Sequence, residues 1–334
     1  MGAVHQGEGV ATMSVRSTAF LLFKRLVAAC LLLAVISLAV FSLVYLSPGS
    51  AEQILAGGKG SISPEQLQRL RAEHHLDEPL LTQYWIWVED AVTLDFGQSI
   101  QTALPVTDEL GARLRVSLIL GGYAFVLTTV AGVLLGLFAA LRRNSILDRA
   151  IVASTLVGLS APAFATALLL LYAFAILVPV FPAFGQGTDF LDTLWHLTLP
   201  ALALATSSTA FLVKHTRAAM LGVLDQDHVV FARARGLSIT TVLFRYVGRN
   251  ALIPITTISA LTFIQFVVGA VLVEVAFSLQ GIGSLLVQAV AAKDVPMVQG
   301  VVMLVAVIVI AANLVADLFS MAVDPRVRLG GRAA

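Results

Sequence analysis

The chain has 334 residues, of which 58% are hydrophobic and 12% charged, and its mean hydropathy is +0.91. Such an apolar composition excludes a soluble globular domain and indicates an integral membrane protein. The net charge of +1 gives no reason to expect a nucleic-acid partner, and the single cysteine, Cys30, excludes an intrachain disulfide.

Six segments of the sequence are long and apolar enough to cross a bilayer, which takes roughly 20 mostly apolar residues. They are residues 26–46, 116–141, 151–178, 197–216, 252–274 and 297–319. Lys24 and Arg25 precede the first segment as they would in a signal peptide, but its length and the lack of a cleavage pattern favour an uncleaved anchor. The sequence therefore predicts an all-α, multi-pass membrane protein after a polar leader, residues 1–25, in which either Met1 or Met13 is the start.

The distribution of lysine and arginine predicts the orientation of these spans. If the N-terminus lies inside the cell, fifteen of the 21 Lys and Arg residues fall on the cytoplasmic side. Five of the remaining six lie in one long external segment, where charge has little influence on topology. Both termini, including the tail at 323–334, are therefore predicted to be cytoplasmic, and so is the segment 225–250.

Residues 47–112 form the only sizeable external segment and are predicted to be a cap that rests on the membrane. The string SPEQLQRL has the signals of a helix start, with Ser63 as the N-cap residue. Helical spacing recurs further along, in Leu81, Trp85, Val88 and Val92. Membrane anchoring by tryptophan is the simpler interpretation, but stacking on a ligand stays open, and we expect residues 63–92 to receive an external partner.

Two prolines are candidate hinges. Pro162 lies inside the third predicted span and Pro254 at the start of the fifth. A proline within a span frees the carbonyl four residues earlier and bends the helix, and for Pro254 that carbonyl belongs to Asn250. Bends are also ordinary packing devices, so a hinge and a static bend are both open.

Few ionisable residues interrupt the predicted spans. Glu274 lies near the outer end of the fifth, and Asp317 lies near the inner end of the sixth. Asn313, four residues before Asp317, shares its helix face, so we expect the two to pair and expect all three polar residues to make contacts between helices. Snorkelling of the two acids and contact with a substrate both stay open. The absence of ionisable residues at mid-span argues against an ion-coupled secondary transporter, which remains an alternative.

No motif in the sequence carries catalytic chemistry. The string AGGKGS lacks the spacing of a nucleotide-binding loop. The six histidines form no metal-binding pattern, and no serine or cysteine nucleophile motif is present. We therefore expect neither a metal, a cofactor nor an enzymatic activity on this chain.

The stretch QDHVVFARARGLSITTVLFRYVGRNALIP, residues 226–254, is too polar to span a bilayer. Asp225 is placed to cap a helix over 226–235, and Gly236 follows where helices commonly end with positive φ. Ser238 is then placed to cap a second helix. The local signals predict two short helices joined by a sharp turn at the cytoplasmic membrane surface.

The charges and apolar residues of this stretch favour a docking element for a cytoplasmic partner. Asp227 in the first turn, with Arg233 and Arg235 in the last, complements the helix dipole. An apolar patch is predicted near the turn, formed by Val230, Ala234 and Leu237. The alternative is a solvated basic loop that only sets topology, which would need the charge but neither helix cap.

The string DHVVFARARGLSITTVLFRYVGRNALIP resembles the coupling loop of binding-protein-dependent ABC permeases, and more narrowly that of the dipeptide, oligopeptide and nickel permeases. The strings GAVLVEVAFSLQGIGSLLVQAV, NLVADLFSMAVDPRVR, HHLDEPLLTQYWIWV and LDFGQSI resemble other parts of the same family. The resemblance runs from about residue 20 to 329, and RNALIP resembles the first of the family's two paired permeases. Four positions depart from the family pattern: Leu94, Phe231, Arg235 and Gln280. Gln280 leaves the outer-loop conformation open.

The resemblance implies a type I ABC importer permease fold over residues 113–322, in a bacterial inner membrane. It also implies four kinds of partner: a homologous second permease, two cytoplasmic ATPase subunits that hold ATP and Mg, an extracytoplasmic binding protein, and the bilayer. The residues that it assigns to ATPase coupling are Asp227, Arg233, Ala234, Arg235, Gly236, Leu237 and Asn250. Short peptides are the expected cargo, while nickel, other small solutes and a non-transporting scaffold stay open.

Overall fold

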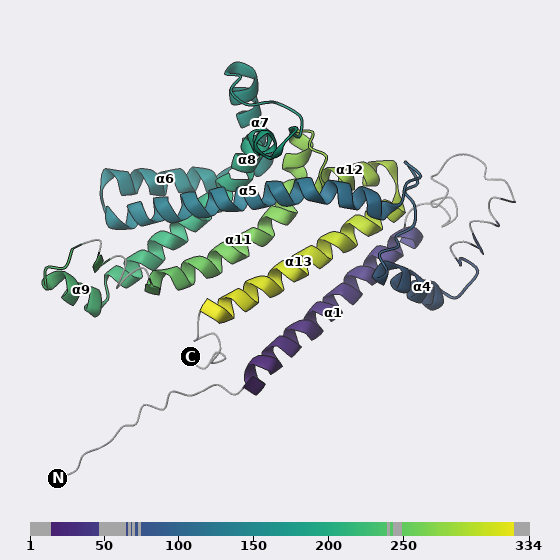
Figure 1. Cartoon of the computed structure of the whole chain (residues 1–334), viewed down its shortest axis with the longest axis horizontal. Coiled ribbons are helices and arrows are strands. Elements are labelled where there is room, and N and C mark those ends of the chain that lie inside the picture. The colour runs from purple at the N-terminus through teal and green to yellow at the C-terminus, as the bar shows by residue number, and fades with distance from the viewer. Residues whose placement is uncertain are drawn as a thin grey trace, which may run out of the picture.

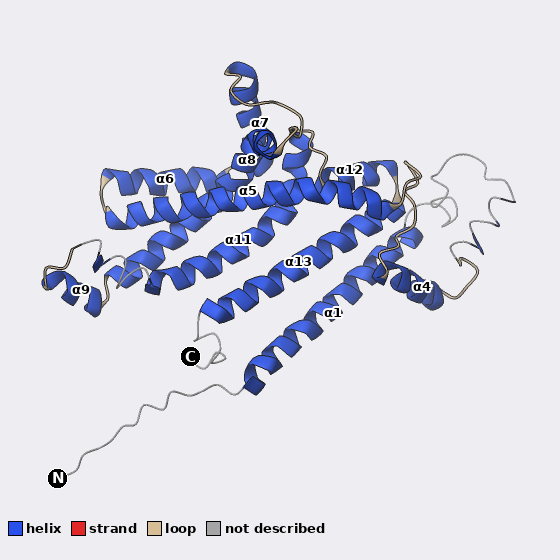
Figure 2. Ribbon diagram, viewed as in Figure 1, coloured by secondary structure: helices blue, strands red, loops and turns tan. Residues whose placement is uncertain are grey.

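The computed structural model describes residues 15–46, 65, 68, 71–72, 75–238, 241–242 and 249–323. Within these ranges the chain folds into helices and loops without a strand (Figure 2). The long helices lie roughly side by side, with α9 at one end of the bundle, α4 and α12 at the other, and α7 standing out from the middle (Figure 1). The all-α prediction is confirmed for this part of the chain.

Within the described residues, four helices are long and apolar enough to cross a membrane: α1 (Val15–Leu46), α5 (Val106–Leu141), α8 (Phe190–Leu224) and α13 (Val295–Val323). Another long helix, α11 (Arg249–Ala276), occupies the fifth predicted span. At about 1.5 Å per residue, α5 is about 54 Å long and exceeds the roughly 30 Å hydrocarbon core, so its polar first turns extend beyond the membrane. The total of six spans and the orientation of the chain stay predictions.

The third predicted span, residues 151–178, is not one continuous helix, and the bend that the sequence predicted at Pro162 lies within it. It consists of α6 (Ile146–Ser160), then α7 (Ala163–Leu171) and the π-helical η1 (Tyr172–Leu177), with a bend of 103° at the break. Pro162 is the residue before α7, and Ala161 has φ −82° and ψ 118°. Proline disfavours helical geometry in the residue before it, which explains why the helix ends there. Whether Pro162 also acts as a hinge stays a prediction.

The core of the bundle lies where α5, α7, α8 and α11 meet, around buried residues such as Leu120, Leu197 and Phe266. Helices α5 and α8 approach each other closely, because small residues on α5 face larger ones on α8. A Cβ placed on Gly136 would lie 2.6 Å from Cβ of Thr216. Such small residues let two helices pack without apolar side chains between their backbones, which is a common arrangement in membranes.

The two ends of the bundle carry different short helices (Figure 1). At one end α9 (Asp227–Ala234) lies close to the end of α8 and the start of α11. At the other end are α4 (Leu80–Val92) and α12 (Ile282–Ala292). Asp294 joins the loop before α5 to the start of α13, because its carboxylate accepts hydrogen bonds from Ser99 Oγ (2.6 Å) and from the backbone N of Met297 (3.2 Å).

Candidate functional site

The polar stretch after α8 begins with a helix whose start differs from the prediction. Backbone N–H groups of Val229 and Val230 donate to the carbonyl of Gln226, so the N-cap position belongs to Gln226. Asp225 instead ends α8, and its carboxylate accepts hydrogen bonds of 3.2 and 3.3 Å from Arg143 Nη1. Capping by Asp225 is therefore wrong. The competing interaction is an ion pair with a residue that lies far away in the sequence.

The end of α9 is the predicted one. Gly236 has φ +76°, and the N–H of Leu237 donates to the carbonyl of Ala232 at 3.3 Å. This is the hydrogen bond of a Schellman motif, in which the residue after the helix takes left-handed geometry. A Cβ on Gly236 would meet nothing within 4 Å, so the backbone angle alone favours glycine at this position.

Ser238 is the predicted cap of the next helical turn. Its Oγ accepts a hydrogen bond of 3.4 Å from the backbone N of Thr241, and its carbonyl accepts one of 3.0 Å from the backbone N of Val242. Both are contacts of a helix N-terminus, so the cap is confirmed. The rest of the predicted second helix, with Arg245, lies outside the described residues.

The two faces of α9 have different surroundings. Val229 and Ala232 are buried against the ends of α8 and α11, in a cluster with Met220, Leu224 and Ile255. On the other face, Val230 is 53% exposed and Phe231 69% exposed. Ala234 is exposed as well, and Leu237 is partly exposed. The helix is therefore fixed to the bundle by one face and presents an apolar surface with the other.

The predicted patch of Val230, Ala234 and Leu237 did not include Phe231, which is its largest member. The sequence contained a signal for it. Val229, Val230 and Phe231 are consecutive, and with about 100° of rotation per residue they cannot all face the bundle. We refer to Val230, Phe231, Ala234 and Leu237 as the α9 patch. Leu237 also lines a hollow of about 410 Å³ together with Arg143 and Asp225.

The other residues that the sequence assigned to coupling surround this patch. Asp227, in the first turn of α9, and Arg235, after its last turn, are both exposed. Arg233 lies within α9 and Asn250 within α11, where the structure describes the backbone alone. The same holds for Pro254, through which α11 continues, so a hinge at that proline stays a prediction.

A buried ion pair, which the sequence did not reveal, fixes α6 to α8 near this end of the bundle. Arg217 donates from Nε and Nη2 to the two carboxylate oxygens of Asp148, at 2.7 and 2.8 Å. Asp148 also accepts from the backbone N of Asn144 and is almost completely buried. A bidentate pair of this kind sets orientation as well as distance, so α8 is held firmly just before α9 begins.

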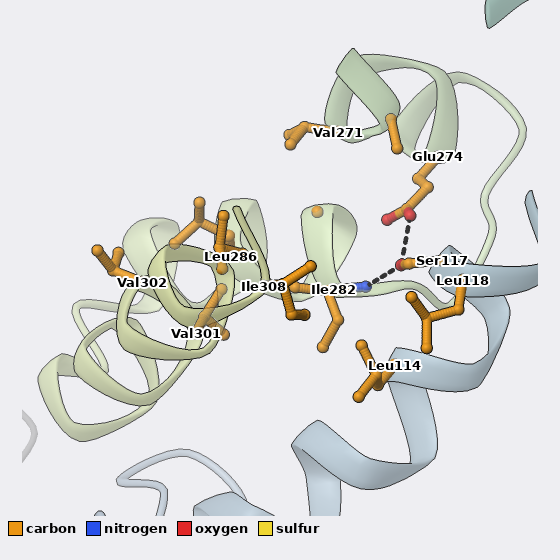
Figure 3. Close-up of a pocket in the computed structure, with 13 residues that line it drawn as sticks. Leu114, Ser117, Leu118, Val271, Glu274, Ile282, Leu286, Val301, Val302 and Ile308 are labelled. Atoms are coloured by element: carbon orange, nitrogen blue, oxygen red, sulfur yellow. Dashed lines mark hydrogen bonds between the residues drawn. The ribbon is translucent and has the colours of Figure 1, made fainter. Parts of the chain in front are cut away.

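Glu274, at the opposite end of α11, is fully buried. Its Oε1 accepts a hydrogen bond of 2.6 Å from Ser117 Oγ on α5, and its Oε2 accepts one of 3.0 Å from the backbone N of Ser284 on α12. Ser117 Oγ in turn accepts from the backbone N of Ile282 at 2.8 Å, as Figure 3 shows at the edge of an apolar cavity of about 180 Å³. The carboxylate therefore joins three helices.

Two glycines allow this approach. A Cβ on Gly281 would lie 2.3 Å from the carboxyl carbon of Glu274, and one on Gly283 would lie 2.5 Å from the Cα of Val271. The spacing of one glutamate and two glycines in EVAFSLQGIG was therefore a signal for a carboxylate seated on a helix start. Sequence reasoning identified Glu274 but neither of its partners.

Asn313 and Asp317 do not form the predicted pair. The amide of Asn313 donates to the carbonyl of Val309 in its own helix at 2.8 Å. Asp317 forms an ion pair with Arg25 of α1. The four-residue spacing placed both residues on one side of α13, but a cation on a neighbouring helix is the stronger partner for the carboxylate.

Among the described residues, no three His, Cys, Asp or Glu side chains gather in a metal-binding arrangement. What the bundle end offers is a surface: an apolar patch on a short helix, bordered by exposed charges. Such a surface suits contact with another protein.

Comparison with known proteins gives two family matches. Residues 18–118 match the family described as binding-protein-dependent transport system membrane component, N-terminal, and residues 132–329 match binding-protein-dependent transport system inner membrane component. The chain is 35% identical, over 92% of its length and 98% of the relative's, to a Brucella abortus (strain 2308) protein named for a peptide transport system permease. It is 34% identical, over 88% of its length and 94% of the relative's, to the dipeptide transport system permease protein DppB of Escherichia coli (strain K12). A third relative is a Sinorhizobium fredii (strain NBRC 101917 / NGR234) protein named for a peptide ABC transporter permease. The chain is 33% identical to it over 92% of its own length and 98% of the relative's.

Proposed function

Because this chain belongs to the family of binding-protein-dependent transport system inner membrane components, we propose that its α9 patch binds a cytoplasmic ATPase subunit and couples it to the import of di- or oligopeptides. Members of this family are the membrane-spanning, non-catalytic permease subunits of such systems, and this chain is one of them. Peptide cargo is supported by the names of the relatives.

The observation that carries the coupling proposal is the division of α9 into a buried and an exposed face. A loop that served topology alone would need its arginines but no exposed phenylalanine, since exposing a large apolar side chain to water is unfavourable. Phe231 and Val230 are mostly exposed although Val229, beside them, is fully buried. A partner that covers the α9 patch accounts for this arrangement.

The contacts of α9 provide a route for movement. Its buried face packs on Met220 of α8 and on Ile255 of α11, so displacement of α9 by a partner would move both long helices. At its far end α11 holds α12 through Glu274 and Ser284. Closure of ATPase subunits at one end of the bundle would thereby reach the opposite end through α11.

The complete importer would contain this chain, a homologous second permease, two ATPase subunits and an extracytoplasmic binding protein. ATP and Mg would be held by the ATPase subunits. Arg235 and Arg233 would meet acidic or carbonyl groups at the rim of the ATPase groove, where charges affect the rate of association more than the final affinity. Ala234 and Gly236 would make the closest contact.

Two substitutions at the contact test the proposal. Ala234→Asp places a carboxylate in the interface without a partner, and Gly236→Val penalises the positive φ of the turn. A loss of about 3 kcal/mol corresponds to about 100-fold weaker association. We therefore expect both variants to lose ATPase co-purification and substrate-stimulated ATP hydrolysis in reconstituted vesicles.

Arg235→Lys is the matched control, because it preserves the charge at an exposed position beside the same turn. Its co-purification and coupled hydrolysis should equal those of the unmodified protein. Ala234 is exposed, so Ala234→Asp should leave the folding of the permease unchanged. If both Ala234→Asp and Gly236→Val retain normal coupling, the stretch is a topology signal and the proposal is wrong.

A further inference from the structure

The external helix α4 has three distinct sides. With about 100° of rotation per residue, Val88, Leu81, Val92 and Trp85 fall within an arc of about 60°. Three of them are strongly exposed: Leu81 by 83%, Trp85 by 62% and Val92 by 78%. We call these four residues the α4 stripe. No charged residue lies within its arc.

A second side of α4 is fixed to α1. Tyr84 Oη and Ser37 Oγ are 2.7 Å apart, in a hydrogen bond. Tyr45 Oη donates to the side-chain oxygen of Gln83. The ring of Phe41 contacts those of Tyr84 and Trp87, with centroids 5.4 and 6.1 Å apart. The helix is therefore held in one orientation, and exposure of the α4 stripe is not a result of a loose attachment.

These contacts set the height of α4 relative to the membrane. Ser37, Phe41 and Tyr45 lie in the last part of α1, whose apolar span is Phe23–Tyr45. Eight residues of helix separate Ser37 from Tyr45, which is about 12 Å along the axis. Helix α4 lies beside this end of α1 (Figure 1). If Phe23–Tyr45 fills the hydrocarbon core, a helix that contacts α1 at that depth is at the level of the lipid headgroups.

The third side of α4 is polar. Thr82, Glu89 and Asp90 are exposed, and on the same rotation their arc is centred about 120° from the centre of the α4 stripe. A helix that lies in the interface with its apolar side in lipid and its acids in water has this distribution. Tryptophan is also the residue enriched at that level, because its ring is apolar and its N–H is polar.

We infer that α4 is an interfacial helix whose stripe, with Trp85 at its centre, is buried in the lipid leaflet at the outer end of α1. Lipid is favoured over a protein partner because the neighbouring α1 also exposes large apolar side chains at this end of its apolar span, Leu38 and Tyr45. The acidic side then remains for water-soluble partners. Within α4 itself, only the polar side would then remain for the external partner expected at residues 63–92.

The position of Trp85 can be measured by fluorescence quenching, since the chain has three tryptophans. Trp87→Phe and Trp195→Phe together leave Trp85 as the single tryptophan of this chain and preserve an aromatic ring at both changed positions. The full chain, purified with the subunits that accompany it, is reconstituted in nanodiscs of phosphatidylcholine brominated at carbons 6 and 7, and the emission of the same complex with Trp85→Phe is subtracted to remove the tryptophans of other proteins. We expect the Trp85 emission to fall at least twofold relative to unbrominated lipid, and aqueous iodide to quench it little.

A tryptophan on the polar side of the same helix is the control. Glu89→Trp, in a background with Trp85, Trp87 and Trp195 all changed to Phe, should be quenched by iodide and little by brominated lipid. If iodide quenches Trp85 and brominated lipid does not, the stripe faces water and is available to a soluble partner. If neither quencher acts, the stripe is covered by another protein chain. Either result overturns the inference.

Discussion

Removal of the Glu274 carboxylate tests how the end of the bundle opposite α9 is held together. Glu274→Ala leaves the partly buried Ser117 hydroxyl and the buried Ser284 N–H without their acceptor. Each unsatisfied donor costs about 1–3 kcal/mol, so the pair gives about 2–6 kcal/mol. The neighbouring cavity of about 180 Å³ could admit a water molecule that replaces part of the loss. We therefore expect the free energy of unfolding to fall by about 2–4 kcal/mol.

Glu274→Gln should remove only part of this stabilisation. The glutamine keeps one oxygen that can accept a hydrogen bond, but its NH₂ group faces a donor where the carboxylate presented its second oxygen. One of the two donors then stays unsatisfied, so the expected loss is about 1–3 kcal/mol. The order of stability should be the unmodified protein first, then Glu274→Gln, then Glu274→Ala.

Equilibrium unfolding in mixed micelles measures these differences. Glu89→Ala is the matched control, because it deletes the same carboxylate from an exposed position and should change stability by no more than about 0.5 kcal/mol. If Glu274→Ala is as stable as Glu89→Ala, the contacts of Glu274 do not hold α12 to the bundle. The route of movement proposed through α11 would then lack its outer connection.

Two further predictions concern helix packing. Gly136→Ala places a Cβ 2.6 Å from that of Thr216 and should lower the free energy of unfolding by about 1–3 kcal/mol. Gly122→Ala is the control, because its Cβ would meet nothing within 4 Å and should not destabilise the protein. Equal effects would show that α5 and α8 are not in close contact. Asp317→Asn retains a hydrogen-bonding group opposite Arg25 on a partly exposed pair, so uptake into vesicles should stay substantial. Complete loss of uptake in a normally assembled complex would instead show an obligatory charge.

Features that depend on neighbouring residues were predictable from the sequence. The turn at Gly236 and the cap at Ser238 are satisfied by backbone groups within five residues, so residue type and spacing were enough to predict them. The approximate location of the long apolar helices followed from hydropathy, because a bilayer imposes a minimum length on each span. The family resemblance over the polar stretch 226–254 was likewise visible in the residues themselves.

Partners distant in the sequence were not predictable. Ser117 and Glu274 are 157 positions apart, and Asp317 finds its cation on α1, not on its own helix. The position of Pro162 indicated a break in the third span, but its angle of 103° depends on how α6 and α7 each pack on α8. Local spacing could propose Asp225 as a cap, and only the fold brought Arg143 close enough to bind it.

Which face of a helix packs against the protein could also be decided only from the tertiary structure. In water, an apolar stripe identifies the buried side of a helix, and on that rule the α4 stripe would have packed against the protein. Beside a membrane the rule fails, because lipid tails are as apolar as the protein interior and accept the same side chains. The sequence by itself determined which segments are helical and apolar; the contacts of Tyr84 and Gln83 with α1 decided that the stripe faces outward.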